Sequence, residues 1–471
     1  MTAGFYSFAL FKKHGTLWLL LFVEALLGVC VILFPAYLPF ILLLGVSLLF
    51  LIIRNPFHGY VLFILLLPFW SLSLLQLFGR VDIRPSDIII LIVFASFLIE
   101  GSIAKKLMLQ PNPINIPLIL FLSWITLSFL WTESLIWGLL QWTKIFWGVA
   151  AFFLTYNLIN NRKRLDLIII LIIAITIVFA LAGIYHFLTA GTEVISQFGP
   201  EETLRWGERE GGLRAAPLQV HPHKFGAMIN YGIILALLQL VISKSKMTKT
   251  LISVTLIILL MSLFVSFSRT SYIALFVVVM LYFLFEKKVR KGLILGVLAI
   301  SITGLIFSPF GRATTERFFQ IFQPGKSTTV GRPSVYLAGL KMFQERPISG
   351  FGVGSFPLVS PRYGAKELVA PHNVIIGVLG DYGIIGIILY ITMVGIFIKK
   401  GLNAYGAIKN QHEKKTLFAI FLGLIMYHVM MMADSYRFGE IQVWVALGIA
   451  IAAMNIFTKS TTNEKNIFTS K

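Results

Sequence analysis

Residues 165–189 read LDLIIILIIAITIVFALAGIYHFLT and directly follow the basic triplet Arg162-Lys163-Arg164. A stretch of this length, with Asp166 as its one acidic residue, is long enough to cross the ~30 Å hydrocarbon core of a bilayer as an α-helix. Lys and Arg gather in the short cytoplasmic loops of membrane proteins. The stretch therefore predicts a transmembrane helix that enters the membrane from the cytoplasm.

The same pattern recurs along the whole chain. Of its 471 residues, 57% are apolar and 13% are charged, and the mean hydropathy is +0.86, whereas a soluble chain carries about 25% charged residues. We therefore expect an all-α fold, a polytopic transmembrane helix bundle of 12–14 spans. The candidate spans are 16–34, 36–53, 57–78, 86–100, 115–131, 135–159, 165–189, 225–243, 250–268, 271–285, 292–308, 373–398, 416–433 and 441–457.

Charge and cysteine content exclude several classes of protein. The net charge is +20, but the basic residues form short clusters between apolar runs, which favours membrane topology and an anionic partner over nucleic acid. The single cysteine, Cys30, excludes intrachain disulfides, a Cys-ligated zinc site and a CxxC redox centre. Gly325-Lys326-Ser327 lacks the first glycine of a P-loop, and we expect no cofactor.

The basic clusters predict the orientation of the chain. If every span is real, eight successive clusters fall on one face, which is then cytoplasmic. Both termini lie on that side, and the long polar segments 190–224 and 309–371 lie outside. The clusters are Lys12-Lys13, Arg54, Lys105-Lys106, Arg162 to Arg164, Lys244 to Lys249, Lys287 to Lys291, Lys399-Lys400 and Lys414-Lys415.

The expected organisation has five parts. Nearly all the outer polar sequence lies in the second half of the chain, which favours a scaffold with one outward-facing site over an inverted-repeat transporter. Residues 314–322 predict an amphipathic outer helix, on the membrane surface or against the bundle. The parts are N-terminal transmembrane helices at 1–189, a first extracytoplasmic loop at 190–224, central transmembrane helices at 225–308, a large extracytoplasmic loop with short helices at 309–371, and C-terminal transmembrane helices with a cytoplasmic tail at 372–471.

Cationic side chains on the outer face are candidates for function. Arg269 stands between two apolar spans, where an ionisable group is costly and usually has a partner. Arg332 opens an expected helix over 331–344, and the N-terminus of a helix favours an anion. Arg214 and Lys224 lie in the first outer loop. Arginine grips phosphate oxygens bidentately, although each of these charges could instead be solvated.

Histidines stand at both points where an outer loop re-enters the membrane. His372 begins the span after the large loop, and an imidazole there can accept a proton near neutral pH or serve as a cap. His221 and His223 hold the equivalent place after the first loop. With no cysteine or carboxylate cluster nearby, we expect no metal. Lys144 lies within a span, as a paired structural charge or a group lining a cavity.

Four motifs, in this order, resemble the bacterial O-antigen ligase and O-antigen polymerase family of polytopic membrane glycosyltransferases. The resemblance covers about 260–400. It rests on Ser268-Arg269-Thr270, on Gly331-Arg332, on Pro347 to Gly354 (PISGFGVG), and on His372-Asn373 followed by Asp381-Tyr382-Gly383. The family more usually shows HPN where this chain has His221-Pro222-His223, and glutamate in place of Asp381.

The resemblance implies a metal-independent, inverting transfer of a glycan from undecaprenyl diphosphate to a sugar hydroxyl at the outer face of the bacterial plasma membrane. The diphosphate is a good leaving group, so the protein must mainly neutralise its charge and orient the acceptor. We assign His372 to the acceptor hydroxyl and Arg269 and Arg332 to the diphosphate, with Arg214 and Lys224 as helpers. Further candidates for substrate contacts are His221, His223, Asn373, Asp381 and Lys144.

The sequence leaves the acceptor open. A ligase would use the sugar of a lipid A core, as in lipopolysaccharide, and a polymerase would use a second lipid-linked glycan. The expected partners are the lipid-linked donor, one of these acceptors and the lipid bilayer. A flippase for lipid-linked oligosaccharide is the alternative function, because Lys144 and Glu24 lie within expected spans.

Overall fold

The computed structural model describes residues 37–69, 75–77, 81–103, 109–189, 222–266, 268–285, 331–365, 370–433 and 438–469. The chain divides into two compact units, Met1–Gly59 with Leu91–Leu107 and Tyr60–Ile90 with Met108–Lys471. The predicted spans 16–34 and 292–308 and the predicted amphipathic helix 314–322 lie outside the described residues.

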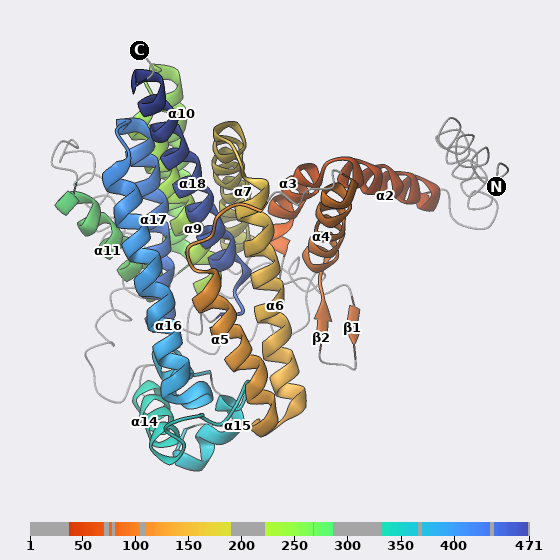
Figure 1. The fold of residues 1–471 in the computed structure, drawn as a ribbon, viewed down its shortest axis with the longest axis vertical. Coiled ribbons are helices and arrows are strands. Elements are labelled where there is room, and N and C mark those ends of the chain that lie inside the picture. Colours follow the sequence, from red (N-terminus) through yellow and green to blue (C-terminus); the bar gives the residue numbers. More distant parts are fainter. Residues whose placement is uncertain are drawn as a thin grey trace. The chain divides into compact units, whose positions relative to one another are not determined.

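The described chain is helical apart from one short hairpin, which confirms the all-α class (Figure 1). The elements are α2 (Tyr37–Arg54), α3 (Pro56–Leu66), η1 (Leu67–Phe69), β1 (Leu75–Leu77), β2 (Val81–Ile83), α4 (Pro85–Ile103), α5 (Asn115–Leu127), η2 (Ser128–Trp131), α6 (Leu135–Leu158), α7 (Arg162–Thr189), α9 (Pro222–Ile242), α10 (Lys246–Val265), α11 (Arg269–Phe285), α14 (Gly331–Glu345), α15 (Phe356–Val359), η5 (Ser360–Tyr363), α16 (Val374–Ala407), α17 (Gln411–Ala433) and α18 (Ile441–Thr469).

The polytopic character of the fold is also confirmed. Eight helices in the described ranges are long and apolar enough to cross a membrane, and four shorter apolar helices accompany them. Each of these helices coincides with one predicted span. Apolar side chains of the long helices remain exposed, as on Val178 (68% exposed) and Ile391 (58%), which is the surface expected of helices that face lipid.

One predicted span ends early. The sequence predicts an apolar crossing over 57–78, but in the described residues α3 passes into η1 at Leu67, and Leu75–Leu77 form a β-strand. Pro68 lacks the backbone N–H that a continuing helix needs. The chain then forms β1, which pairs antiparallel with β2 so that Gln76 lies opposite Asp82.

The first unit contains a close contact between two of its helices. The hydroxyl of Ser96 on α4 donates a hydrogen bond of 2.7 Å to the carbonyl of Ile52 on α2. A buried hydroxyl that bonds to a carbonyl of a neighbouring helix is a common device where water is absent. The described part of this unit is therefore a packed helical pair.

The core of the second unit is built on close packing of α6 against α18. Gly148 on α6 leaves room for the indole ring of Trp444, because a Cβ at that position would lie 2.2 Å from a ring carbon. Gly448 on α18 similarly faces Thr155, whose hydroxyl accepts a 3.0 Å hydrogen bond from the Tyr60 hydroxyl. Small residues allow helices to approach closely where no hydrophobic effect drives them together.

The second unit has two chemically different ends. At one end α6, α16 and α18 finish and α7 and α17 begin, and Arg162 bonds both to Asp166 (2.8 Å) and to His412 (3.0 Å). The α9–α10 turn with its lysines lies at the same end, because Val241 and Lys415 line one pocket. The basic clusters at 162–164, 244–249 and 399–415 therefore share one end, as predicted.

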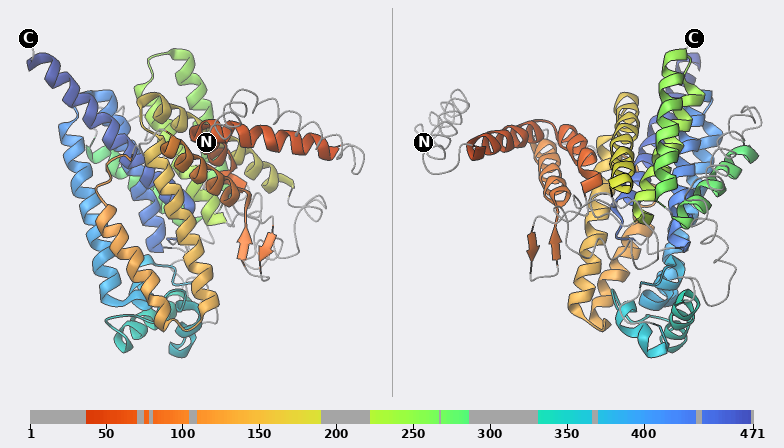
Figure 2. Two further views of the ribbon diagram at one scale, coloured as in Figure 1. Left: turned by 45° about the vertical axis from the view of Figure 1, so that its right-hand side comes forward. Right: turned by 180° about the vertical axis from the view of Figure 1, so that it is seen from behind.

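The opposite end carries α14 and α15. Figure 2 shows α14 and α15 beside the ends of α5, α6 and α16 that lie away from the C-terminus. At this end the α5–α6 turn contacts the loop after α14, through a 2.7 Å hydrogen bond from the Thr132 hydroxyl to the Val353 carbonyl. We call this the loop end of the bundle. The candidate site residues that the structure describes lie toward this end, Lys144 included, since it lies beside Gly439, the neighbour of the residue that pairs with Lys224.

Candidate functional site

A glycine-rich loop at residues 350–354 anchors the loop end. Its three glycines all have positive φ angles, 64° at Gly350, 92° at Gly352 and 72° at Gly354, a region that costs most other residues energy. A Cβ would lie 2.6 Å from the Asp381 carbonyl oxygen at the first glycine and 2.5 Å from the Trp137 carbonyl oxygen at the third. Glycine is therefore needed both for the turn and for the close backbone approach.

Asp381 binds this loop to α16. Its side chain is buried, and its Oδ1 accepts a 2.7 Å hydrogen bond from the backbone N–H of Phe356, while its carbonyl accepts one of 2.8 Å from Gly352. Helix α16 is interrupted two residues later at Gly383, where φ is 62° and ψ is −160°. Asp381, predicted as a candidate substrate contact, thus performs an architectural role in holding the loop.

The other side of the loop is bound to the α5–α6 turn. Ser355 lies at the centre of this contact, where its hydroxyl accepts a 3.1 Å hydrogen bond from the Glu133 N–H and lies 3.1 Å from the Thr132 hydroxyl. The Glu133 carboxylate pairs with Arg362 at 2.8 Å. The hydrogen bond from Arg362 lowers the pKa of Glu133 below its ordinary value, against an opposing effect of burial.

A second contact stabilises the segment after the loop. The hydroxyl of Tyr363 hydrogen-bonds to the Glu345 carboxylate at the end of α14. Burial, and then this bond, raise the pKa of Tyr363 to about 12. The guanidinium of Arg346 lies 4.4 Å from the ring centroid of Phe351, within the range of a cation–π contact. Charged and aromatic contacts thus hold the end of α14, the glycine-rich loop and η5 together.

His372, two residues before the start of α16, has an unusual backbone conformation. Its φ is 50°, and no other non-glycine residue in the described ranges has a positive φ. The hydroxyl of Tyr336 on α14 donates a 3.3 Å hydrogen bond to the His372 carbonyl. Strained backbone of this kind occurs at functional sites when the surroundings enforce it. Here the neighbouring helix supplies that constraint.

Asn373 fixes the start of α16 directly after His372. Its Oδ1 accepts hydrogen bonds from the N–H groups of Ile375 (2.9 Å) and Ile376 (3.2 Å), and its Nδ2 donates to the carbonyl of Met432 (3.0 Å). It is an N-cap and a link to α17. The predicted candidate for a substrate contact therefore uses its amide to position the neighbouring histidine.

Arg332 lies on the same helix face as the residue that holds His372. It precedes Tyr336 by four positions on α14, and residues four apart on a helix are neighbours on its surface. Its side chain is partly buried, and in the described chain it has no ion pair or hydrogen bond. As predicted, it stands in the first turn of its helix, where free backbone N–H groups favour an anion.

A further candidate, His223, lies at the start of α9. His223 Nδ1 lies 2.9 Å from the hydroxyl of Ser268, and that hydroxyl accepts a 2.6 Å hydrogen bond from Ser271. The Ser268 carbonyl accepts the N–H of Tyr272, so that Ser268 caps α11, whose first residue is Arg269. The structure thus brings His223 to the backbone that carries Arg269.

Lys224 is held by an acidic residue that the sequence analysis missed. Its Nζ lies 2.8 Å from Oε1 of Glu440, which is 7% exposed. The second carboxylate oxygen, Oε2, is buried and has no hydrogen-bond partner among the described residues. An acid at the loop end of the last span was the available signal, but its partner lies 216 positions earlier and no spacing pattern connects the two.

The remaining candidates are placed less fully. Lys144 is exposed on α6 and lies next to Gly439, where an added Cβ would come within 2.8 Å of the lysine Cβ. Arg214, His221 and Glu24 lie outside the described residues, as does the side chain of Arg269. Among the residues that were described, no group of three His, Cys, Asp or Glu side chains is arranged to hold a metal ion.

Comparison with known proteins identifies the segment that carries these features. The family model for O-antigen ligases matches residues 254–391. The match spans most of α10, then α11, α14, the glycine-rich loop and the first half of α16, and therefore includes Arg269, Arg332, His372 and Asp381. No curated protein matches the chain. The four motifs and this match together show that residues 254–391 are similar to the O-antigen ligase family.

Proposed function

We propose that this chain is a multi-pass membrane glycosyltransferase of the bacterial plasma membrane. It transfers an oligo- or polysaccharide from undecaprenyl diphosphate to a sugar hydroxyl of an acceptor, at the outer face. The observation that supports this proposal is the position of the family segment: its motifs at Arg269, Arg332 and His372 belong to the end of the bundle opposite the basic loops. With the basic end in the cytoplasm, the reaction takes place outside and both termini lie inside.

In this proposal the cationic residues bind the diphosphate. Arg332 combines a permanently charged guanidinium with the N-terminus of α14, and both favour an anion. Arg269 opens α11 in the same manner. Lys224 is positioned beside it by the His223–Ser268 contact and by Glu440, with Arg214 as a further helper. Removal of one such hydrogen bond to a charged group costs about 1.5–3 kcal/mol.

His372 acts on the acceptor. The acceptor hydroxyl oxygen attacks the anomeric carbon, the bond from that carbon to the diphosphate oxygen breaks, and the hydroxyl proton passes to the imidazole of His372. The configuration inverts because one displacement occurs from the face opposite the leaving group. No metal ion takes part in this scheme. The backbone of His372 is held in place by its left-handed conformation, by the Asn373 cap and by the Tyr336 hydrogen bond. The imidazole therefore starts from a fixed position.

The acceptor decides between two forms of the reaction. A ligase transfers the glycan to a lipid A core sugar, and a polymerase transfers it to a second lipid-linked glycan. Both reactions need the same donor site and the same base, so the residues above serve either one. The assay below distinguishes the two acceptors.

The test is a reconstituted assay with purified protein and an undecaprenyl diphosphate oligosaccharide in EDTA. Longer lipid-linked glycans from the wild type would show a polymerase, and product only after addition of lipid A core would show a ligase. His372→Ala should abolish either product. The control is Lys409→Ala, which removes an exposed cation at the basic end and should leave the rate unchanged. Activity that requires an added divalent ion, or translocation of the donor with no glycan transfer, would overturn the proposal.

A further inference from the structure

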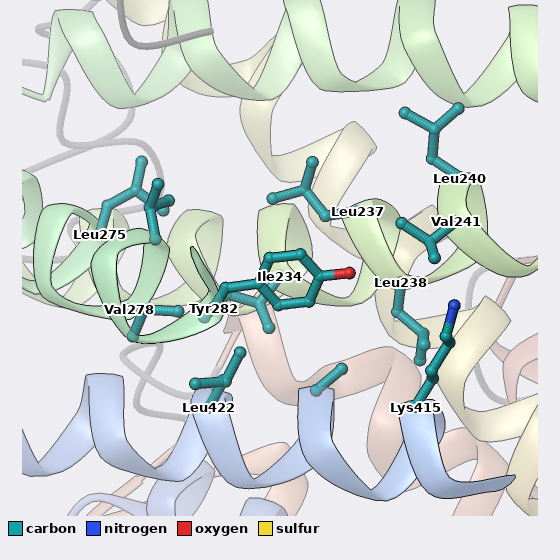
Figure 3. Close-up of a pocket in the computed structure, with 12 residues that line it drawn as sticks. Ile234, Leu237, Leu238, Leu240, Val241, Leu275, Val278, Tyr282, Lys415 and Leu422 are labelled. Carbon is teal, nitrogen blue, oxygen red and sulfur yellow. The ribbon is translucent and has the colours of Figure 1, made fainter. Parts of the chain in front are cut away.

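An apolar pocket lies between α9, α11 and α17, toward the basic end of the second unit (Figure 3). Leu, Ile, Val and Ala side chains form most of its lining, and Tyr282 and Lys415 are the polar residues among them. A pocket with so few polar groups suits a hydrocarbon ligand.

The pocket runs inward from the helix ends. Val241, one residue from the end of α9, and Lys415, in the second turn of α17, line it at the level of the loops, whereas Ile234 and Leu422 line it seven residues deeper on the same helices. Seven residues of α-helix rise about 10 Å. That depth is roughly two thirds of one leaflet of a ~30 Å hydrocarbon core.

Lys415 places a positive charge at the mouth of this pocket, at the basic end of the unit. Its side chain is partly buried and has no ion pair or hydrogen bond in the part of the chain that the structure describes. Figure 3 shows its ammonium group beside Val241, at the end of the pocket. A lysine whose stem follows apolar surface while its head reaches the interface is well placed to meet a lipid phosphate.

We propose that this pocket binds one acyl chain of an anionic phospholipid, whose headgroup phosphate pairs with Lys415. Charge complementarity selects this occupant: Lys244, Lys246 and Lys249 lie on the adjoining α9–α10 turn, at the same end. Anionic lipids accumulate at such basic surfaces. The pocket lies at the end opposite His372 and Arg332, so the proposal is independent of the glycosyl transfer proposed above.

The test uses the full chain in zwitterionic detergent with a phosphatidylglycerol that carries a diazirine on one acyl chain. After illumination, we expect labelled peptides from α9, α11 and α17, and loss of labelling when unmodified phosphatidylglycerol is added. A phosphatidylcholine with the same modified chain should label more weakly. Equal labelling by the two lipids would overturn the role of the charge, and label confined to other helices would overturn the site.

Two variants separate the headgroup contact from the chain contact. Lys415→Gln should reduce labelling by phosphatidylglycerol about fivefold, the factor that corresponds to one basic residue near an anionic surface. Ala419→Phe fills the pocket and should reduce labelling by both lipids tenfold or more. The matched control is Lys414→Gln, because the Lys414 ammonium lies 4.6 Å from the ring centroid of Tyr405 and does not line the pocket.

Lys414→Gln should label like the wild type, and an equal loss in the two lysine variants would reduce the effect to general surface charge and overturn the proposal. If Ala419→Phe lowers the melting temperature, the comparison of Lys415→Gln with Lys414→Gln decides alone. Full labelling in Lys415→Gln would also overturn the pairing with the phosphate.

Discussion

The ammonium of Lys224 lies 2.8 Å from Oε1 of Glu440, and this pair joins the first turn of α9 to the residue before α18. Glu440 is almost fully buried, so its charge depends on Lys224 for compensation. The pair lies beside the turn that carries Arg269, since His223, the neighbour of Lys224, contacts Ser268. An ion pair that the sequence analysis missed therefore helps to build the candidate site.

Removing one partner of this pair should destabilise the protein more than removing both. Lys224→Met leaves Glu440 buried without compensation, and breaking a buried pair in this way costs about 3–5 kcal/mol. Because Lys224 is partly exposed, we expect a loss near the lower end of that range. The double variant Lys224→Met with Glu440→Gln should recover much of the loss. Thermal unfolding in detergent measures all three, and strictly additive losses would contradict the coupling.

Arg332 should be sensitive even to a conservative change. Arg332→Lys keeps the charge but loses the planar fork that binds two phosphate oxygens. We expect kcat/KM for the lipid-linked donor to fall about tenfold, and up to about a hundredfold in Arg332→Ala. Lys341→Ala, which removes an exposed cation from the same helix, is the control. Equal effects at positions 332 and 341 would show that α14 provides only general positive charge.

Two glycines with the same φ, one in the glycine-rich loop and one after it, allow two sources of strain to be separated. Gly352→Ala combines a φ of 92° with a Cβ only 2.7 Å from the Ser128 carbonyl oxygen, whereas Gly364→Ala has the same φ and open space around it. The left-handed conformation alone costs about 1–2 kcal/mol. We therefore expect Gly364→Ala to lose about that much stability and Gly352→Ala clearly more, together with most activity. Equal melting temperatures for the two variants would show that the loop is not held against η2.

The Glu133–Arg362 pair predicts a modest sensitivity to acid. The pKa of Glu133 is lowered in the folded protein, so its stabilising effect is complete above the pKa of the unfolded chain, near 4.3, and disappears as the pH falls through the folded value. Arg362 is largely exposed, which keeps the effect small. Melting temperatures between pH 6 and pH 3 should therefore fall less in Glu133→Gln than in the wild type. Parallel curves would contradict this.

The two ends of the bundle predict opposite accessibility. In a Cys30→Ala background, which contains no other cysteine, Arg362→Cys should react with an impermeant maleimide added outside intact cells. Lys246→Cys, at the basic end, should react only after the membrane is permeabilised. The reverse pattern would invert the predicted orientation and would place the proposed active site in the cytoplasm.

Fold class was accessible from the sequence because a membrane span needs only a long apolar run. Such a run reveals little about where polar side chains point. Asp381 and Asn373 stand among the family's motifs, yet the structure uses both to hold the backbone. Glu440 went unnoticed because its importance comes from burial beside Lys224, and burial depends on the packing of α17 against α9 and α18. The strand β1, which lies inside the span predicted over 57–78, shows the same limit.

The hydrogen bond from Tyr336 ends on the carbonyl of His372 and leaves the imidazole out of the anchoring contact. The imidazole of His372 can therefore be removed without removing the backbone hydrogen bond that holds this residue. A glycine at position 372 accepts the left-handed backbone without strain and keeps the carbonyl that Tyr336 binds. His372→Gly should then leave a space that free imidazole can fill, and imidazole added to the buffer should restore part of the lost transfer. The same addition should have no effect on Arg332→Ala.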